Sequence, residues 1–531
     1  MNTVEPVMNS GEPRVGVNCE VTNAKKKLRH MQKQLLSCLT FCLLLAGAAH
    51  AQLPDLPIIR DTLYSKILKE ARPLEIVLPS GYNRESAAGT SVIYATDGEW
   101  NTRIIAEFSQ FLGIQFIPPQ IIVGIDNTPK GEGNMRFRDL TPTAVPNYPG
   151  SGGGDLFLVF IKKELIPYIN QKYPNKQTNT YFGASAGGLF GLYALLKEPG
   201  LFNSYLLADP SLFWDGYAMQ KLAGENLEQL RGLNETVMLT GRRGQPFRGM
   251  GISGMDSVLR DRAPGDLQLK TLAYDDETHN SMIFRTVYDG LKFIYKGYYT
   301  SRNFGLHPAY GYLEAGNPVT LYSPDTALAD IHYTMDGTPP TRQSKRLDQA
   351  SLEISAPAEL HFVSFANKPE YDTTVSAHFQ WSPQFKALSL PKNGRPGGLH
   401  YAIYNGISEQ QTAKPVQSGT ADSIFAMQKT MVAAPFTCLL DGYFEAKTDG
   451  YYLFIFDTPG EIQFSLAGRL LLNYPGQTGG SLLVPLKKGF YPFRLACFYR
   501  TGEKKLNLYY ESPENVKTDR AGPLPLNLLY H

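Results

Sequence analysis

Between about residues 57 and 300, short apolar runs alternate with longer stretches of helical periodicity, and this alternation stops near residue 303. The apolar runs are mostly continuous, which indicates strands that are covered on both faces of a sheet. The clearest helical stretch, residues 154–173, repeats its apolar side chains at 3.6-residue spacing. The alternation therefore predicts an α/β domain with crossover connections. Its strands are expected at residues 74–79, 91–97, 120–126, 179–185, 203–209, 236–241 and 269–276.

The second half of the chain carries no comparable helical signal. Residues 303–382 contain short strands and turns, and a linker rich in Pro and Gly follows at 390–398. A third region, 398–531, alternates strands with turns that contain Gly. A chain of 531 residues is too long for one core. We therefore expect a multidomain protein, in which an α/β domain at 57–300 precedes two small all-β modules, a sandwich and a barrel.

Composition excludes some classes of partner. The chain has 51 basic and 49 acidic residues, so no overall field attracts nucleic acid or an anionic membrane. Hydrophobic residues make up 43% and charged residues 19% of the chain, which is typical of a folded protein. We expect no nucleic-acid partner, no cofactor and no metal site.

The N-terminal region has the features of an export signal. Basic residues at 25–33 precede the apolar stretch "LLSCLTFCLLLAGAA", which ends in the small-x-small pattern Ala49-His50-Ala51. These features predict a signal peptide over 1–51, with Met31 as an alternative start, and a periplasmic or secreted protein. The apolar run is short for a membrane span, so no transmembrane segment is expected after cleavage.

Two cysteines, Cys438 and Cys497, lie beyond the predicted cleavage site, both in strand-like runs. An oxidising compartment permits a disulfide between them. Two buried thiols are the alternative, and two cysteines alone do not support a structural metal site.

The residues Gly183-Ala184-Ser185-Ala186-Gly187 match the pattern G-x-S-x-G. An expected strand leads into this pattern and an apolar helical run follows it. This context predicts a sharp, strained turn that presents Ser185 as a nucleophile at the carboxyl end of the sheet. The amide of Ala186 would then donate to an oxyanion. The alternative is that the glycines only permit a strand and a helix to pack closely.

A serine nucleophile needs a base, and His279 is the histidine that follows the last expected strand of the α/β domain. The sequence leaves several candidates for the acid that orients His279. The usual loop, after residues 236–241, reads Arg242-Arg243-Gly244 and holds no carboxylate. Asp209 and Asp256 are possible acids, and the carboxylates at 275–277 lie close in sequence to His279. A Ser–His dyad held by a backbone carbonyl is a further alternative.

The second oxyanion donor is expected in the loop after residues 91–97. Gly98 allows the backbone to approach, and the amide of Glu99 is the candidate donor. Trp100 and Trp214 are either walls of an acyl or aromatic pocket or ordinary core aromatics.

Five segments follow one another along the α/β region: "IIVGIDNTPKGEGNMRFRDLTP", "FIKKELIPYINQKYP", "GASAGGLFGLYAL", "DPSLFWD" and "ETHNSM". In this order they resemble the putative-esterase family of α/β hydrolases, which includes enterochelin esterases, esterase D and some feruloyl and acetylxylan esterases. The resemblance covers about residues 60 to 300 and implies Ser185 as nucleophile and His279 as base. It also implies that Arg138, in the segment "RDLTP", shapes the entrance to the site and binds substrate. Ala184 stands where the family often has His.

The all-β modules carry resemblances of their own. The segment "IHYTMDGTPPTRQS", within 303–382, looks like the C-terminal β-module of chitobiases and β-hexosaminidases. Residues 398–531 contain the segments "GLHYAIYNG", "DGYFEAKTDGYYLFIF", "AGRLLLNY", "LKKGFYPFRLACFY" and "LNLYYESP". These segments resemble the β-barrel module of anthrax protective antigen, also found in glycosidases and adhesins. In lectin members an adjacent Asp pair binds calcium, whereas this chain reads Asp457-Thr458 there.

These patterns predict an exported serine esterase that cleaves acyl, feruloyl or acetyl esters on carbohydrate, with β-modules that bind polysaccharide. One alternative is a siderophore esterase, for which Arg136, Arg138, Arg242 and Arg243 would line a basic pocket. A second alternative is a catalytically inactive carbohydrate-binding surface protein, since the usual acid is missing.

Overall fold

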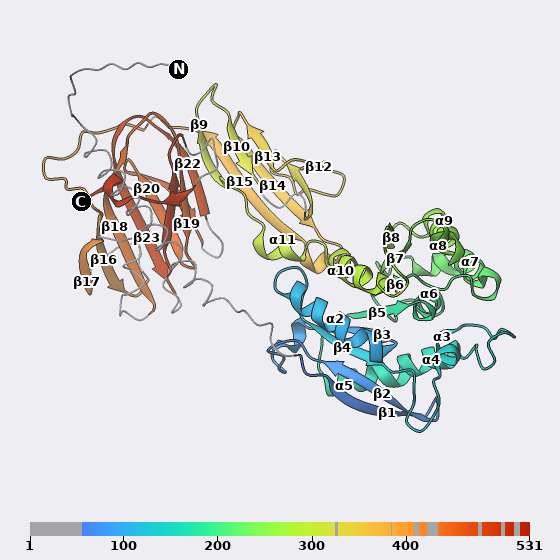
Figure 1. Cartoon of the computed structure of the whole chain (residues 1–531). Coiled ribbons are helices and arrows are strands. Elements are labelled where there is room, and N and C mark those ends of the chain that lie inside the picture. Colours follow the sequence, from blue (N-terminus) through green and yellow to red (C-terminus); the bar gives the residue numbers. More distant parts are fainter. Residues whose placement is uncertain are drawn as a thin grey trace, which may run out of the picture. The chain divides into compact units, whose positions relative to one another are not determined.

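An eight-stranded sheet forms the centre of the N-terminal half (Figure 1), with strands in the order β1-β2-β4-β3-β5-β6-β7-β8. The structure is a computed structural model that describes residues 56–323, 328–383, 385–407, 414–421, 434–475, 480–500, 505–514 and 521–531. Strands β3 to β8 run parallel, and β1 and β2 add an antiparallel edge. The strands are β1 (Ile59–Ser65), β2 (Glu70–Val77), β3 (Ser91–Thr96), β4 (Gln120–Ile125), β5 (Asn179–Ala184), β6 (Ser204–Ala208), β7 (Thr236–Arg242) and β8 (Gln268–Tyr274).

Side chains of the central strands are buried on both faces of this sheet, as their continuous apolar sequence predicts. In β3, Val92 and Tyr94 join one apolar cluster, while Ile93 and Ala95 join the cluster on the other face. Successive side chains of a strand point to opposite faces, so each face requires its own layer of helices.

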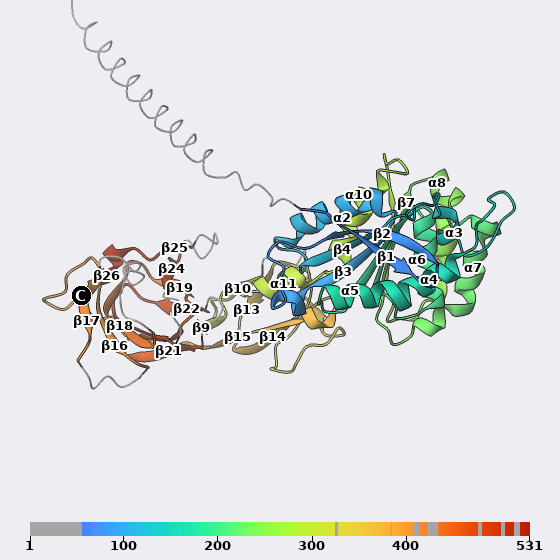
Figure 2. The same ribbon diagram turned by 90° about the horizontal axis from the view of Figure 1, so that it is seen from below.

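Helices supply those two layers, as Figure 2 shows with the sheet between them. Apolar residues of α4, α5, α6, α7 and α9 cover one face, and those of α2 and α10 cover the other. The helices are α2 (Gly98–Gly113), α3 (Arg136–Leu140), α4 (Gly154–Phe160), α5 (Ile166–Lys172), α6 (Ala186–Lys197), α7 (Trp214–Asn226), α8 (Gln245–Gly249), α9 (Ile252–Arg262), α10 (Met282–Ile294) and α11 (Tyr298–Asn303).

The seven strands expected from the sequence coincide with β2 to β8, with ends that differ by a few residues. Strand β1 was not expected. Its sequence, IRDTLYS, carries no continuous apolar run, because β1 lies at the edge of the sheet and most of its side chains are partly exposed.

The C-terminal half is built of strands. Its first part contains β9 (Tyr310–Leu313), β10 (Val319–Tyr322), β11 (Asp330–Thr334), β12 (Lys345–Arg346), β13 (Ser351–Ile354), β14 (Ala358–Phe365) and β15 (Thr373–Trp381). Its second part contains β16 (Leu399–Asn405), β17 (Gln417–Ala421), β18 (Phe436–Ala446), β19 (Gly450–Asp457), β20 (Glu461–Leu466), β21 (Arg469–Tyr474), β22 (Gly480–Leu486), β23 (Gly489–Tyr499), β24 (Asn507–Glu511), β25 (Gly522–Pro523) and β26 (Leu529–Tyr530).

Strand β9 joins these two parts. It pairs in parallel with β15 on one side and with β22 on the other, so one nine-stranded sheet contains strands from both expected modules. Two separate apolar clusters nevertheless form, one mostly from residues 304–379 and one mostly from residues 399–529. The region is therefore β-rich with two cores, and its division into two independent modules stays a prediction.

The predicted signal peptide, residues 1–51, lies outside the described residues. Within the part of the chain that the structure describes, no helix has the length and apolar character needed to cross a bilayer.

Cys438 and Cys497 face each other across the antiparallel pair β18–β23, and both side chains are buried. The structure holds them as thiols rather than as a disulfide. Burial raises the pKa of Cys497 to about 12 and raises that of Cys438 as well. Because the thiolate is the reactive form, both sulfurs are protected in the native state.

In a protein that begins at Gln52, and so lacks Cys19, Cys38 and Cys42, we expect both thiols to resist Ellman's reagent in the native state. Both should react fully in about 6 M guanidinium chloride, which unfolds a domain of ordinary stability. The reaction is followed by absorbance, with free glutathione as the positive control. Prompt labelling without denaturant would contradict the burial of the pair.

Candidate functional site

The neighbouring parallel strands β3 and β5 end at the same edge of the sheet, and each leads directly into a helix. Helix α2 follows β3 and packs on one face, while α6 follows β5 and packs on the other. The strand order reverses at this point, since β4 lies on the far side of β3. Ligands of open α/β sheets bind at such a switch point, beyond the carboxyl ends of the strands.

Ser185 occupies the turn between β5 and α6 with φ 58° and ψ −116°, a left-handed conformation that is strained for a residue with a Cβ. Its amide donates to the carbonyl of Ala208, the last residue of the neighbouring strand β6, at 2.9 Å. Its Oγ lies 3.1 Å from Oγ of Ser211, and the amide of Ser211 donates to the Ser185 carbonyl at 3.0 Å. These bonds fix the turn against the end of β6.

The glycines around Ser185 are required by close packing. A Cβ on Gly183 would lie 2.3 Å from the carbonyl oxygen of Gly187, and one on Gly188 would lie 2.7 Å from Pro210. A Cβ on Gly187 would lie 2.5 Å from Oγ1 of Thr96, at the end of β3. The close-packing interpretation of the glycines and the strained turn therefore hold together and are not alternatives.

Asp209 and His279 meet at this edge, although 70 positions separate them in sequence. Nδ1 of His279, in the loop after β8, lies 2.7 Å from Oδ2 of Asp209. Asp209 directly follows β6 with φ 42°, and its side chain is only 1% exposed. Nε of Arg242, the last residue of β7, donates to the same Oδ2 at 2.6 Å. A carboxylate this deeply buried needs such partners.

The other candidate acids lie in different surroundings. Asp256, on α9, pairs with Arg260 one turn later on the same helix. Asp275 pairs with Arg243. Of the carboxylates proposed from the sequence, the structure brings Asp209 to the imidazole of His279.

A second buried ion pair lies beside the serine on the β3 side. Asp97, with φ 54°, precedes α2 and accepts from Nε of Arg136 at 2.6 Å and from Nη2 at 3.0 Å. The same Nη2 donates to the carbonyl of Ala184, directly before Ser185, at 3.3 Å. Burial alone would lower the pKa of Arg136, but its hydrogen bonds to Asp97 outweigh this and raise it. Arg136 thus joins the end of β3 to the end of β5.

Gly98 and Glu99 form the first turn of α2, and Ala186 is the first residue of α6. First-turn amides of a helix have no acceptor within the helix, so both helices direct donors toward this edge. A Cβ on Gly98 would lie 2.7 Å from the backbone of Gly124, so the close approach of α2 to β4 requires glycine there.

Burial, and then the charge of Glu99, raise the pKa of Asp126, which follows β4, to about 7.

The three side chains expected to bind substrate have different environments. Arg138 is held in a network in which it donates to Glu70 at 2.7 and 2.9 Å and to Asp139 at 2.8 Å. Arg72, fully buried, bonds to the same two carboxylates. Trp100 is 75% exposed on α2, whereas Trp214 is buried at the start of α7.

Sequence analysis did not single out Asp97, Ser211 or the role of Arg242 as a partner of Asp209. Arg242 is the last residue of β7, the strand after which the acid is usually found. There it donates a hydrogen bond to Asp209, the candidate acid that follows β6. Two of them lie beside residues that the sequence did indicate: Asp97 directly precedes Gly98, and Ser211 follows Asp209 by two residues.

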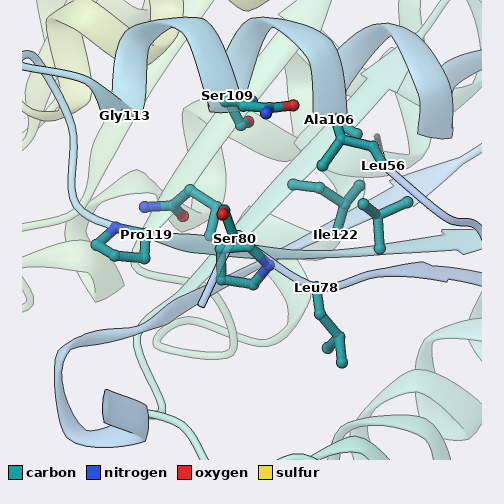
Figure 3. Close-up of a pocket in the computed structure, with 12 residues that line it drawn as sticks. Leu56, Leu78, Ser80, Ala106, Ser109, Gly113, Pro119 and Ile122 are labelled. Carbon is teal, nitrogen blue, oxygen red and sulfur yellow. The ribbon is translucent and has the colours of Figure 1, made fainter. Parts of the chain in front are cut away.

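A small cavity of about 130 Å³ lies elsewhere in the α/β domain (Figure 3). Its walls come from the end of β2, the start of β4 and the later part of α2, and include Ser80, Ser109 and Ile122. Because β2 runs antiparallel to β4, the end of β2 and the start of β4 lie together at the edge of the sheet opposite the one where β5 leads into Ser185, so the cavity is separate from the candidate site.

Comparisons with known proteins bear on residues 65–227, which match the family model described as "Putative esterase". Ferri-bacillibactin esterase BesA of Bacillus subtilis is 33% identical over 162 residues, which are 28% of this chain and 56% of that protein. The siderophore triacetylfusarinine C esterase of Aspergillus fumigatus is 32% identical over 131 residues, 23% of this chain and 45% of the relative. The siderophore enterobactin esterase of Emericella nidulans is 39% identical over 77 residues, which are 14% of this chain and 25% of that protein.

The chain thus spans about half or less of the length of these curated relatives. Among solved structures, an IroE-like serine hydrolase from Shewanella oneidensis is 30% identical, covering 45% of this chain and 81% of that chain with a TM-score of 0.42. The BES protein from Bacillus cereus is 25% identical, and the match covers 46% of this chain and 97% of that chain with a TM-score of 0.41.

The contact between α6 and β3 leads to a stability prediction. Replacing Gly by Ala inside a helix usually stabilises it, but Gly187→Ala would press a methyl group into Thr96 and cost about 1–3 kcal/mol. We expect a thermal midpoint several degrees below that of the native protein. Gly113→Ala, at the end of α2 with open space around its Cβ, is the matched control and leaves the midpoint unchanged or slightly higher. Equal midpoints for the two variants would contradict the close approach.

Proposed function

We propose that this protein is a serine carboxylic-ester hydrolase that cleaves an ester-linked siderophore. The observation that carries the chemistry is the strained Ser185 turn beside an Asp209–His279 pair, at the carboxyl edge of a parallel sheet. The substrate class is supported by three curated relatives, all named as siderophore esterases. They favour the siderophore alternative over the carbohydrate ester preferred from the sequence.

The proton transfer follows from the hydrogen bonds of His279. When Nδ1–H of His279 donates to Asp209, Nε2 carries the lone pair and acts as the base. It accepts the proton of Ser185 Oγ as that oxygen attacks the ester carbonyl carbon. The bond between Ser185 Oγ and Ser211 then gives way to one with the base.

The tetrahedral intermediate carries a negative charge on the former carbonyl oxygen. The amides of Ala186 and Glu99, at the starts of α6 and α2, are the proposed donors to this oxyanion. The Arg136–Asp97 pair holds the two strand ends that carry these donors and so acts as a positioning element.

Collapse of the intermediate expels the alcohol, which takes the proton from the imidazolium of His279, and leaves an acyl group on Ser185. Water, deprotonated by the same imidazole, attacks the acyl-enzyme and releases the acid. Throughout, Arg242 offsets the buried charge of Asp209, so that the carboxylate remains a hydrogen-bond acceptor.

The charges near the serine do not form an open basic pocket. Arg136 pairs with Asp97, Arg138 with Glu70 and Asp139, Arg242 with Asp209, and Arg243 with Asp275. Support for a siderophore therefore comes from the relatives and not from these arginines. Export and polysaccharide binding by the β-rich half stay predictions.

The proposal is tested with the purified protein and Ser185→Ala on four substrates: p-nitrophenyl acetate, enterobactin, triacetylfusarinine C and feruloylated xylan. We expect turnover of at least one siderophore ester, and a loss of about 10³-fold or more in kcat with Ser185→Ala. Products are followed by chromatography and mass spectrometry. Turnover of xylan esters alone would favour the carbohydrate reading, and equal rates for both proteins would refute serine catalysis.

The acid is tested by a matched pair of substitutions. Asp209→Asn removes the acceptor that fixes the tautomer of His279, so kcat for p-nitrophenyl acetate should fall about 10²–10⁴-fold. Asp256→Asn, which changes a carboxylate that pairs with Arg260 on its own helix, should stay within about twofold of the native rate. No loss with Asp209→Asn would favour a Ser–His dyad, and comparable losses in both variants would contradict a specific role for Asp209.

A further inference from the structure

Three aromatic side chains from separate segments gather beside the candidate site. They are Phe137 on α3, Tyr148 in the loop before α4, and Trp214 at the start of α7. Ring centroids are 4.9 Å apart for Phe137–Tyr148, 5.2 Å for Tyr148–Trp214 and 6.3 Å for Phe137–Trp214. We name these three residues the aromatic triad.

The aromatic triad is half open to solvent. Phe137 is 42% and Tyr148 43% exposed, while Trp214 is buried beneath them. Nε1 of Trp214 donates to the carbonyl of Thr143 at 3.1 Å, which ties α7 to the loop that carries Tyr148. Exposed aromatic side chains that gather into one patch over a buried residue are typical of binding surfaces.

Short hydrogen-bonded paths connect this surface to the serine turn from two directions. Ser211 donates to the Ser185 carbonyl, and the amide of Trp214 donates in turn to the Ser211 carbonyl at 3.2 Å. On the other side, Arg136 donates to the carbonyl of Ala184, and Phe137 is the next residue. The triad is therefore fixed to both flanks of the proposed nucleophile.

Backbone strain adjoins the same surface. Asp215, Gly216 and Tyr217, directly after Trp214, have φ of 48°, 60° and 65°, and two of these residues carry a Cβ. Left-handed runs of this kind cost free energy, and they concentrate at ligand-binding positions.

The two arginines that flank Phe137 in the chain are both paired with carboxylates. Phe137 lies between Arg136, which is bound to Asp97, and Arg138, which is bound to Glu70 and Asp139. These two arginines therefore present no free positive charge to a ligand, and the exposed rings of Phe137 and Tyr148 suit an aromatic ring that packs against them.

We propose that the aromatic triad is a subsite that binds an aromatic ring of the ester substrate, and that it makes the enzyme select aryl over alicyclic esters. This inference rests on the proposed function, since it assigns a substrate class to the same site. The ring can belong to the acyl group or to the alcohol.

The test compares two pairs of esters that are similar in size, and each kcat/KM is divided by the rate constant for alkaline hydrolysis of the same ester to remove the difference in intrinsic reactivity. Methyl phenylacetate and methyl cyclohexylacetate place the ring in the acyl group, whereas benzyl acetate and cyclohexylmethyl acetate place it in the alcohol. We expect the native protein to prefer the aryl member of one pair in kcat/KM. Phe137→Ala and Tyr148→Ala should each lower kcat/KM for that aryl ester about five- to tenfold, mainly through KM, and change its alicyclic partner less than twofold.

Phe111→Ala is the matched control, because Phe111 is an exposed ring on α2 outside the triad. It should leave all four rates unchanged. Equal losses on aryl and alicyclic esters, or no aryl preference in either pair, would overturn the subsite while leaving the esterase proposal intact.

A binding measurement separates the two proposals. Saturation-transfer difference NMR of methyl phenylacetate on Ser185→Ala should show transfer to the ring protons, and this transfer should disappear when Phe137 and Tyr148 are both replaced by Ala. If the native protein hydrolyses none of the esters, the proposed function fails and this measurement still decides whether the ring binds. Unchanged transfer in the double replacement would refute the subsite.

Discussion

The parallel alignment of β3, β5 and β6 is the constraint on which the candidate site depends. Because these strands end at one edge, Asp97, Ser185 and Asp209 follow one another across the sheet, and all three have positive φ. The amide of Ser185 reaches the carbonyl of Ala208, so the turn that holds the serine is part of the hydrogen bonding between strands. A shift of one strand would displace both the proposed nucleophile and the proposed acid.

Two ion pairs keep charge balanced at this edge. Asp97 with Arg136 lies on the β3 side, and Asp209 with Arg242 lies on the β6 side. Each carboxylate is almost fully buried, and a carboxylate in such a place is stable only when cations and donors surround it. Arg136 and Arg242 thus stabilise the buried carboxylates of the site. Arg136 and Arg242 are therefore engaged by these carboxylates and do not present free charges to an anionic substrate.

Local signals identified part of this arrangement. The strand, glycine-rich turn and helix around Ser185 are adjacent in sequence, and the structure has them as β5, the strained turn and α6. Asp209 could be named only as one possibility beside Asp256, because nothing local distinguishes a carboxylate that faces His279 from one that pairs along its own helix. Edge strand β1 escaped notice for a related reason, since half-exposed strands carry a weak apolar pattern.

The sequence by itself determined the α/β class of the N-terminal half, the β-rich class of the C-terminal half, and the sharp turn at Ser185. These follow from periodicity and from residues that are neighbours in the chain. Only the tertiary structure decided that Asp209 contacts His279, that Arg136 joins Asp97 to the serine turn, and that Phe137, Tyr148 and Trp214 form one surface. It also decided that β9 joins both β-parts in one sheet. Such contacts unite residues far apart in sequence, and they are set by strand order and by helix packing rather than by any local preference.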